Sequence, residues 1–228
     1  MALEQRQIDQ DLIYEDGEPM ENAHHGTLAW DDLVLPLRAW LRRTGFQAFV
    51  GSNSPVGYER GVPALGPDLY VVNGGVDHGQ EGWASWREGG LTPTLAVEML
   101  CPSTEARDRG EKMRIYRDVL KTTDYFLFQS ETGGVEYYRL KDGIYARTHS
   151  NRRGQFRCAS LPLLLGVLNG RLRWFERNGA VLPNSNEMDA LVQEGRARAD
   201  EERARADEAE AQAGRLRARL RALGIEDA

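Results

Sequence analysis

The sequence predicts an α/β domain that is followed by a C-terminal helical tail. The apolar run 95–100 ends before Pro102 and is typical of a buried strand. Residues 105–120 then have the spacing of a helix, with Ser103 or Thr104 as its N-cap. At Glu187 the composition changes to Ala, Arg and Glu. A strand, a helix and a separate charged tail therefore define the expected order of the chain.

The first part of the chain predicts a hairpin and one long helix. Asp16-Gly17 is a favoured hairpin turn between two short strands. Apolar residues then recur at helical spacing from Leu28 to Leu41, with Thr27 as a plausible N-cap and Gly45 as a plausible stop. Because proline lacks a backbone N–H, Pro36 should kink this helix or mark its true start.

The remaining strands follow from apolar runs bounded by turn residues. The stretch 73–90 holds six glycines with Trp83 and Trp86, and predicts a mobile surface loop near the site. Its tryptophans could stack on bases or form a hydrophobic lid over the sheet. Lys141-Asp142-Gly143 predicts a hairpin turn. The expected strands are 46–50, 69–72, 95–100, 125–129, 135–140 and 144–149, with 161–168 and 172–175 closing the core.

The tail carries a sustained heptad pattern. Its seam positions are 188, 192, 195, 199, 202, 206, 209, 213, 216, 220 and 223. The seam is strong only at its three leucines, and the tail holds eight arginines against eleven acids. Acids gather at 200–210 and arginines at 215–221, which suits staggered or antiparallel pairing. A solvated single helix is the alternative. We therefore expect a domain over 1–182, a linker at 183–186 and a coiled-coil tail over 187–228.

Composition excludes several classes of protein. The 228 residues are 41% hydrophobic and 28% charged, so most of the chain can bury a core. A net charge of −6 argues against a broad basic surface for nucleic acid. Two cysteines give no disulfide framework, and no apolar run reaches the ~20 residues of a membrane span. Because the N-terminus also lacks a signal-peptide core, we expect a soluble cytoplasmic protein.

Three charged residues stand where chemistry is plausible. Asp68 follows Pro67 at the mouth of an apolar strand, Glu98 interrupts the central strand, and Lys112 lies on the next helix. Carboxylates on adjacent strand ends can hold Mg²⁺, and a nearby ammonium can stabilise a reacting phosphate. The alternatives are structural: Glu98 in a buried ion pair, and Lys112 in a surface pair with Asp108.

These residues belong to an ordered set of short motifs that resembles the Uma2 family. This is a group of restriction-endonuclease-like proteins in the PD-(D/E)xK superfamily, and the resemblance spans about residues 12–178. The matching stretches are Gly17-Glu18, His25-Gly26, Pro67-Asp68 with the strand 69–72, and 97–104 around Glu98, followed by Asp108, Lys112, Tyr116 and 124–126.

The resemblance implies an α/β sandwich with a central mixed sheet flanked by helices. It also implies Asp68 and Glu98 as ligands of Mg²⁺ or Mn²⁺. Position 100 is Leu where the wider superfamily has Lys, so Lys112 is the candidate for a migrated catalytic lysine. Glu18 is a candidate third acid or a solvent-facing strand residue. His25 also matches the family pattern.

The expected function is that of a metal-dependent endonuclease that hydrolyses phosphodiester bonds in DNA. We expect a homodimer assisted by the tail, because such a dimer would place two sites on one duplex. The alternative is a catalytically degenerate nuclease fold that serves as a coiled-coil interaction module. Leu100 and the acidic net charge favour this alternative, whereas the intact set of Asp68, Glu98 and Lys112 favours the enzyme.

Overall fold

The computed structural model describes residues 27–223. The predicted hairpin at 16–17, Glu18 and His25 lie outside the described residues. The chain divides between Ser185 and Asn186 into two compact units, which are described separately. The first unit contains every described strand and two helical segments, and the second consists of the tail helix.

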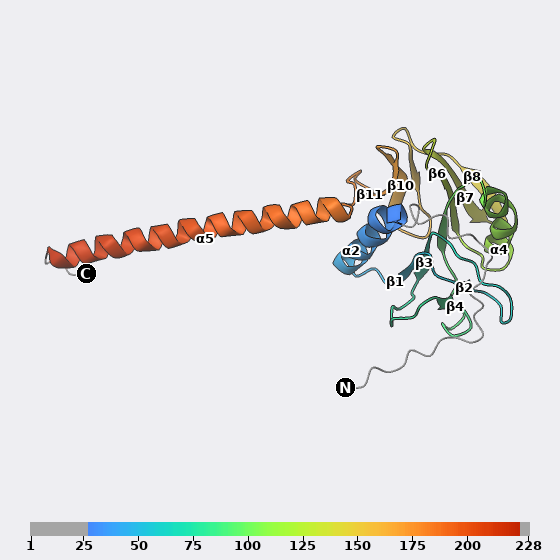
Figure 1. Ribbon diagram of the computed structural model, residues 1–228, viewed down its shortest axis with the longest axis horizontal. Helices are drawn as coiled ribbons and strands as arrows, with labels where there is room; N and C mark the ends of the chain where they lie inside the picture. Colours follow the sequence, from blue (N-terminus) through green and yellow to red (C-terminus); the bar gives the residue numbers. More distant parts are fainter. Residues whose placement is uncertain (1–26, 224–228) are drawn as a thin grey trace. The chain divides into compact units, whose positions relative to one another are not determined.

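A six-stranded mixed sheet forms the centre of the first unit (Figure 1). Neighbouring strands of this sheet pair antiparallel, except for β5 and β6, which pair parallel. This confirms the expected mixed sheet. In spatial order the strands are β1 (Ala48–Gly51), β3 (Leu69–Asn73), β5 (Leu95–Met99), β6 (Asp124–Gln129), β7 (Gly134–Lys141) and β8 (Ile144–Thr148).

Two smaller sheets accompany the central one. β9 (Gln155–Arg157), β10 (Leu163–Leu168) and β11 (Arg171–Glu176) form an antiparallel sheet in the order β11-β10-β9. β2 (Val56–Gly57) and β4 (Trp83–Ala84) pair parallel. The turn between β7 and β8 is the predicted hairpin, since Asp142 and Gly143 have φ of 51° and 78°.

Both predicted helices are present, and each contains a π-helical turn. The first runs through 27–29, η2 (Trp30–Val34) and α2 (Leu35–Thr44), and it ends at Gly45 in the left-handed conformation. Pro36 lies inside this continuous helix, two residues after η2, so it does not mark the start of the helix. The second runs through α3 (Glu105–Arg107), η3 (Asp108–Lys112) and α4 (Met113–Asp118).

The central sheet is covered on both faces, because side chains of its strands alternate between two hydrophobic clusters. Val97 and Phe126 belong to the cluster that includes η2, α2 and the β9–β11 sheet. Ala96 and Leu127 belong to the other cluster, together with residues of α4, β2 and β4. Glu98 has the same parity as Ala96 and therefore points to the α4 side of the sheet.

The tryptophan-containing loop lies on the surface over 76–79, as expected, but it is anchored in the core at Gly75 and 83–85. Trp83 is fully buried, packs on Phe49 with ring centroids 4.9 Å apart, and donates from Nε1 to the Leu91 carbonyl oxygen at 2.8 Å. Trp83 therefore covers the sheet, and the stacking role considered for it is wrong. Gly75 allows the chain to pass closely over this ring, since a Cβ there would lie 2.8 Å from it.

The second unit contains α5, which spans Ser185–Ala222. The helix begins at Ser185, two residues earlier than the expected start at Glu187. No described residue of α5 is buried. The coiled-coil pairing of the tail thus stays a prediction. No helix within 27–223 is long and apolar enough to cross a membrane.

Candidate active site

Asp68 and Glu98 come together because β3 and β5 are antiparallel neighbours. Leu69 pairs with Val97, so the next position outward places Asp68 opposite Glu98. Residues directly opposite in an antiparallel pair point to the same face, with Cβ atoms about 5 Å apart. The structure therefore brings together the two carboxylates that are 30 positions apart in the sequence.

Backbone contacts fix the orientation of Asp68. Its Oδ2 accepts a 2.7 Å hydrogen bond from the Met99 N–H, directly after Glu98. Its carbonyl oxygen accepts a 2.6 Å hydrogen bond from Ser52 Oγ. Asp68 is partly exposed, whereas Glu98 is 1% exposed. Asp68 is thus the solvent-accessible member of the acidic pair.

Lys112 lies between two buried acids. Its Nζ donates to Glu98 Oε2 at 3.3 Å and lies 3.0 Å from Asp108 Oδ1. The second contact is an ion pair without hydrogen-bond geometry, since Asp108 Oδ1 accepts no hydrogen bond from the described residues. The surface Asp108–Lys112 pair considered from the sequence is therefore wrong, because Lys112 and Asp108 are each 1% exposed.

Further residues complete this cluster. Tyr116 donates from its hydroxyl to Glu98 Oε1 at 3.0 Å, and Thr104 donates to Asp108 Oδ2 at 3.0 Å. Sequence reasoning placed Asp108 and Tyr116 in the family motif but assigned neither to the site. Their spacing from Lys112, four residues on either side, was the available signal, because such residues share one helix face.

The π-helical turn η3 has a role in this arrangement. It spans Asp108 to Lys112, so the chain widens where the helix faces Glu98. Such turns are rare and are often found at functional sites. Asp108 and Lys112 are the first and last residues of η3, and they form the ion pair of this site.

The two tyrosines beside the acids remain protonated. Burial raises the pKa of Tyr116 well above its usual value, and the negative charge of Glu98 raises it further. Burial and the charges of Glu98, Asp108 and Asp68 likewise raise the pKa of Tyr125, which donates to the Asp108 carbonyl oxygen at 2.9 Å. Both hydroxyls are thus fixed as hydrogen-bond donors that hold this acidic cluster in place.

The oxygens of this site suit a hard cation. Within the described residues there is no cluster of three or more His, Cys, Asp or Glu side chains that could hold a metal. Asp68 and Glu98 are the residues that could hold Mg²⁺, a cation that binds proteins through one or two carboxylates and keeps several waters.

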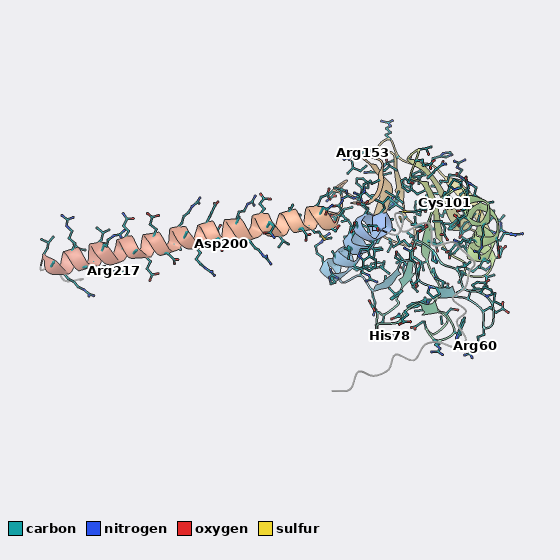
Figure 2. The ribbon with its side chains drawn as sticks, in the orientation of Figure 1. Arg60, His78, Cys101, Arg153, Asp200 and Arg217 are labelled. Atoms are coloured by element: carbon teal, nitrogen blue, oxygen red, sulfur yellow. The ribbon has the colours of Figure 1, made fainter. Side chains whose placement is uncertain are left out.

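Cys101 follows the central strand and contacts this cluster through Thr104. Its Sγ lies 3.0 Å from Ser103 Oγ and 3.1 Å from Thr104 Oγ1, and the residue is buried. The thiol therefore fills the turn between β5 and α3, which agrees with a packing role. Figure 2 labels Cys101 at this position in the first unit.

Comparisons with known proteins agree with the resemblance. The Uma2 family, described as "Putative restriction endonuclease", matches residues 2–167. A protein of Synechocystis sp., "Uncharacterized protein slr1290", is 44% identical over 50 residues. This match covers 22% of the chain and 26% of that relative, so the chain spans about a quarter of its length.

A solved structure also matches, at lower similarity. It is described as "a putative nuclease belonging to DUF820" from Anabaena variabilis, is 15% identical, and has a TM-score of 0.42. The match covers 59% of this chain and 74% of that chain. Because the family match spans well over half of the sequence, the chain belongs to the Uma2 family of restriction-endonuclease-like proteins.

Proposed function

We propose that this protein is a metal-dependent endonuclease that hydrolyses phosphodiester bonds in DNA. Asp68 and Glu98 hold Mg²⁺ or Mn²⁺, and Lys112 assists. The observation that carries the proposal is the pairing of β3 with β5, which sets the two acids side by side next to the Lys112 ammonium. Membership of a family described as a restriction endonuclease supports the same reaction class.

Each residue has a distinct role in this proposal. Asp68, oriented by the Met99 N–H, presents its carboxylate at the solvent-facing edge of the site. A bound divalent cation would neutralise phosphate charge and lower the pKa of a water nucleophile. Lys112 adds a positive charge where negative charge develops on the phosphate. Asp108 and Tyr116 hold Lys112 and Glu98 in place.

A cleavage assay tests this function. Supercoiled and linear duplex DNA are incubated with the full chain and Mg²⁺ or Mn²⁺, with chelator as a blank. We expect metal-dependent cleavage that Asp68→Asn and Glu98→Gln abolish. Asp142→Asn in the distant hairpin is the matched control, because Asn tolerates the left-handed conformation there. The proposal is contradicted if the wild-type protein cleaves DNA with neither metal. It is also contradicted if both site variants cleave DNA as fast as the wild type.

The second candidate is a degenerate nuclease fold that serves protein interaction. It is favoured by the burial of Lys112 between Glu98 and Asp108, since a buried ion cluster can serve the fold alone. The exposed leucines of α5 would then carry the function. In this case the protein binds no Mn²⁺, cleaves nothing, and still associates through its tail.

The enzyme is expected to act as a homodimer. Cleavage of a duplex requires attack on two strands, and each chain offers a single pair of Asp68 and Glu98. Two copies would supply one such pair for each strand. The expectation is tested by sedimentation of the full chain with and without duplex DNA, where a monomer in both conditions contradicts it.

A further inference from the structure

The leucines at the end of α5 face solvent in the single chain. Leu216 is 56% exposed, Leu220 is 40% exposed and Leu223 is 67% exposed. Spaced four and three residues apart, they form one stripe along the helix. A stripe of large apolar side chains on an otherwise charged helix is the usual mark of a surface that pairs with another helix.

The same segment has an unbalanced charge. It carries Arg215, Arg217, Arg219 and Arg221, and none of them has an Asp or Glu three or four positions away. Arginines four residues apart also repel each other along a helix. This arginine block, 215–221, is therefore electrostatically unsatisfied within its own helix. Figure 2 labels Arg217 within it and Asp200 further toward the start of α5.

The middle of α5 has the opposite charge. The segment 200–210, the acid block, contains Asp200, Glu201, Glu202, Asp207, Glu208 and Glu210 against two arginines. Arg205 already pairs with Glu201 at 3.7 Å within the helix. Glu210, in contrast, has no Lys or Arg three or four positions away. The chain thus carries an acidic and a basic segment, each with members that lack a helical neighbour of opposite charge.

We propose that α5 pairs antiparallel with α5 of a second copy of this chain, in one specific register. Leu216 of one helix faces the partner's Ala213. Leu220 then faces the partner's Ala209, and Leu223 faces the partner's Ala206. All of these positions lie on the heptad seam. Each leucine therefore meets an alanine, and each such layer occurs twice by symmetry.

The charges that border the seam agree with this register. Residues just beside the seam of an antiparallel pair contact residues at the equivalent flanking position of the partner. In this register Glu210 reaches the partner's Arg217, and neither has a partner of opposite charge at helical spacing in its own chain. Slightly further out, Asp207 approaches the partner's Arg221. The acid block of each helix thus faces the arginine block of the other.

A parallel pair of the same helices is less favourable. It would place Leu216 opposite Leu216 and Leu220 opposite Leu220, but it would also set the two arginine blocks side by side. Glu202, a seam residue, would face its own copy. In the antiparallel register, Glu202 lies close to the end of the overlap. Charge therefore selects the antiparallel arrangement.

A charge-swap experiment on the full chain tests the inference by sedimentation equilibrium. We expect the wild type to dimerise, and Glu210→Arg and Arg217→Glu each to raise the dimer Kd by about tenfold, because two attractive contacts become repulsive. An equimolar mixture of the two variants should regain wild-type affinity. In that mixed dimer both contacts join opposite charges again, a result that parallel pairing does not give.

Controls separate this effect from loss of helix or of enzyme. Arg198→Glu reverses a charge outside the overlap, at a side chain 74% exposed, and should leave the dimer Kd unchanged. Circular dichroism should show equal helix content in all variants. A monomeric wild type at tens of micromolar, unaltered Kd in the single variants, or no recovery in the mixture overturns the inference. Sedimentation measures dimerisation without any DNA cleavage. Failure of this inference and failure of the proposed endonuclease activity can therefore be distinguished.

Discussion

Lys112 Nζ lies 3.3 Å from Glu98 Oε2, although 14 positions separate the two residues and each is about 1% exposed. The contact joins the central strand to the helix that follows it. Asp108 holds the other side of the same ammonium at 3.0 Å. An ion pair in this position fixes the catalytic candidates before any substrate arrives, and it also makes the fold sensitive to their loss.

Loss of Asp68 is expected to weaken metal binding without unfolding the protein. Asp68→Ala removes a partly exposed carboxylate and one hydrogen bond to the Met99 N–H. We expect Mn²⁺ affinity to fall by tenfold or more, in line with the ~10–100-fold effect of weaker, indirect contacts. Isothermal calorimetry measures it, with Asp142→Asn as control. Unchanged affinity would remove the metal assignment from this residue.

Loss of Glu98 is expected to destabilise the protein as well as to remove a ligand. Because Glu98 is paired with Lys112 and accepts from Tyr116, Glu98→Ala leaves two buried donors without their acceptor. We expect unfolding free energy to fall by about 3 kcal/mol, measured by urea denaturation. A stability gain would mean instead that repulsion between Glu98 and Asp68 dominates the site.

Substitution of Lys112 separates charge from shape. Lys112→Met leaves Glu98 and Asp108 buried without their cation and should cost about 3–5 kcal/mol, so its activity must be compared with its folded fraction. Lys112→Arg keeps the charge. We expect reduced cleavage by Lys112→Arg at nearly normal metal affinity, because a planar guanidinium does not reproduce a compact ammonium. Wild-type turnover in both variants would exclude Lys112 from catalysis.

The Tyr116 hydroxyl should contribute more to stability than a tyrosine bound to a neutral acceptor. Tyr116→Phe removes a buried hydrogen bond to a carboxylate, for which we expect a loss of about 1.5–3 kcal/mol. Tyr145→Phe is the matched comparison, since its hydroxyl donates to the neutral Thr122 carbonyl oxygen at 2.9 Å. Denaturation midpoints measure both. Equal losses would show that the charge of Glu98 adds nothing.

Stability should fall in acid partly through Glu136. Burial would raise the pKa of this carboxyl, but hydrogen bonds from Tyr138 and Arg109 outweigh it and leave the pKa below its usual value. A depressed folded-state pKa stabilises the fold above the unfolded-state pKa of 4.5, and this contribution is lost as pH falls through the folded value. Glu136→Gln should therefore destabilise at pH 7 and become neutral at strongly acidic pH. A pH-independent effect would contradict the assignment.

The apolar seam of the tail should contribute as much to dimer affinity as the charges of the tail do. Leu216→Asp combined with Leu220→Asp places two charges on the stripe and should raise the dimer Kd as truncation after Asn186 does. Each buried Leu contributes on the order of 1.5–3 kcal/mol, so the double variant should dissociate the dimer at micromolar concentration. Sedimentation measures this, and an unchanged urea denaturation midpoint of the first unit is the control for its intact fold.

The sequence by itself determined the elements and most of their order. The central strand, the hairpin at 141–144 and both helices follow from local spacing, because a strand, a turn and a helix each leave a pattern within a few residues. It also singled out Asp68, Glu98 and Lys112, since an acid or a cation next to apolar strands is conspicuous. The ordered motifs likewise predicted membership of the Uma2 family, which the family match confirms.

Only the tertiary structure decided which of these residues meet. The register of β3 against β5 sets Asp68 opposite Glu98, and the packing of the second helix on the sheet brings Lys112 to Glu98. Neither contact can be read from local spacing, because strand register and helix-to-sheet contacts depend on packing between distant segments. The same reason explains Trp83: glycines around it predicted an exposed loop, but its indole is large enough to be worth burying against Phe49.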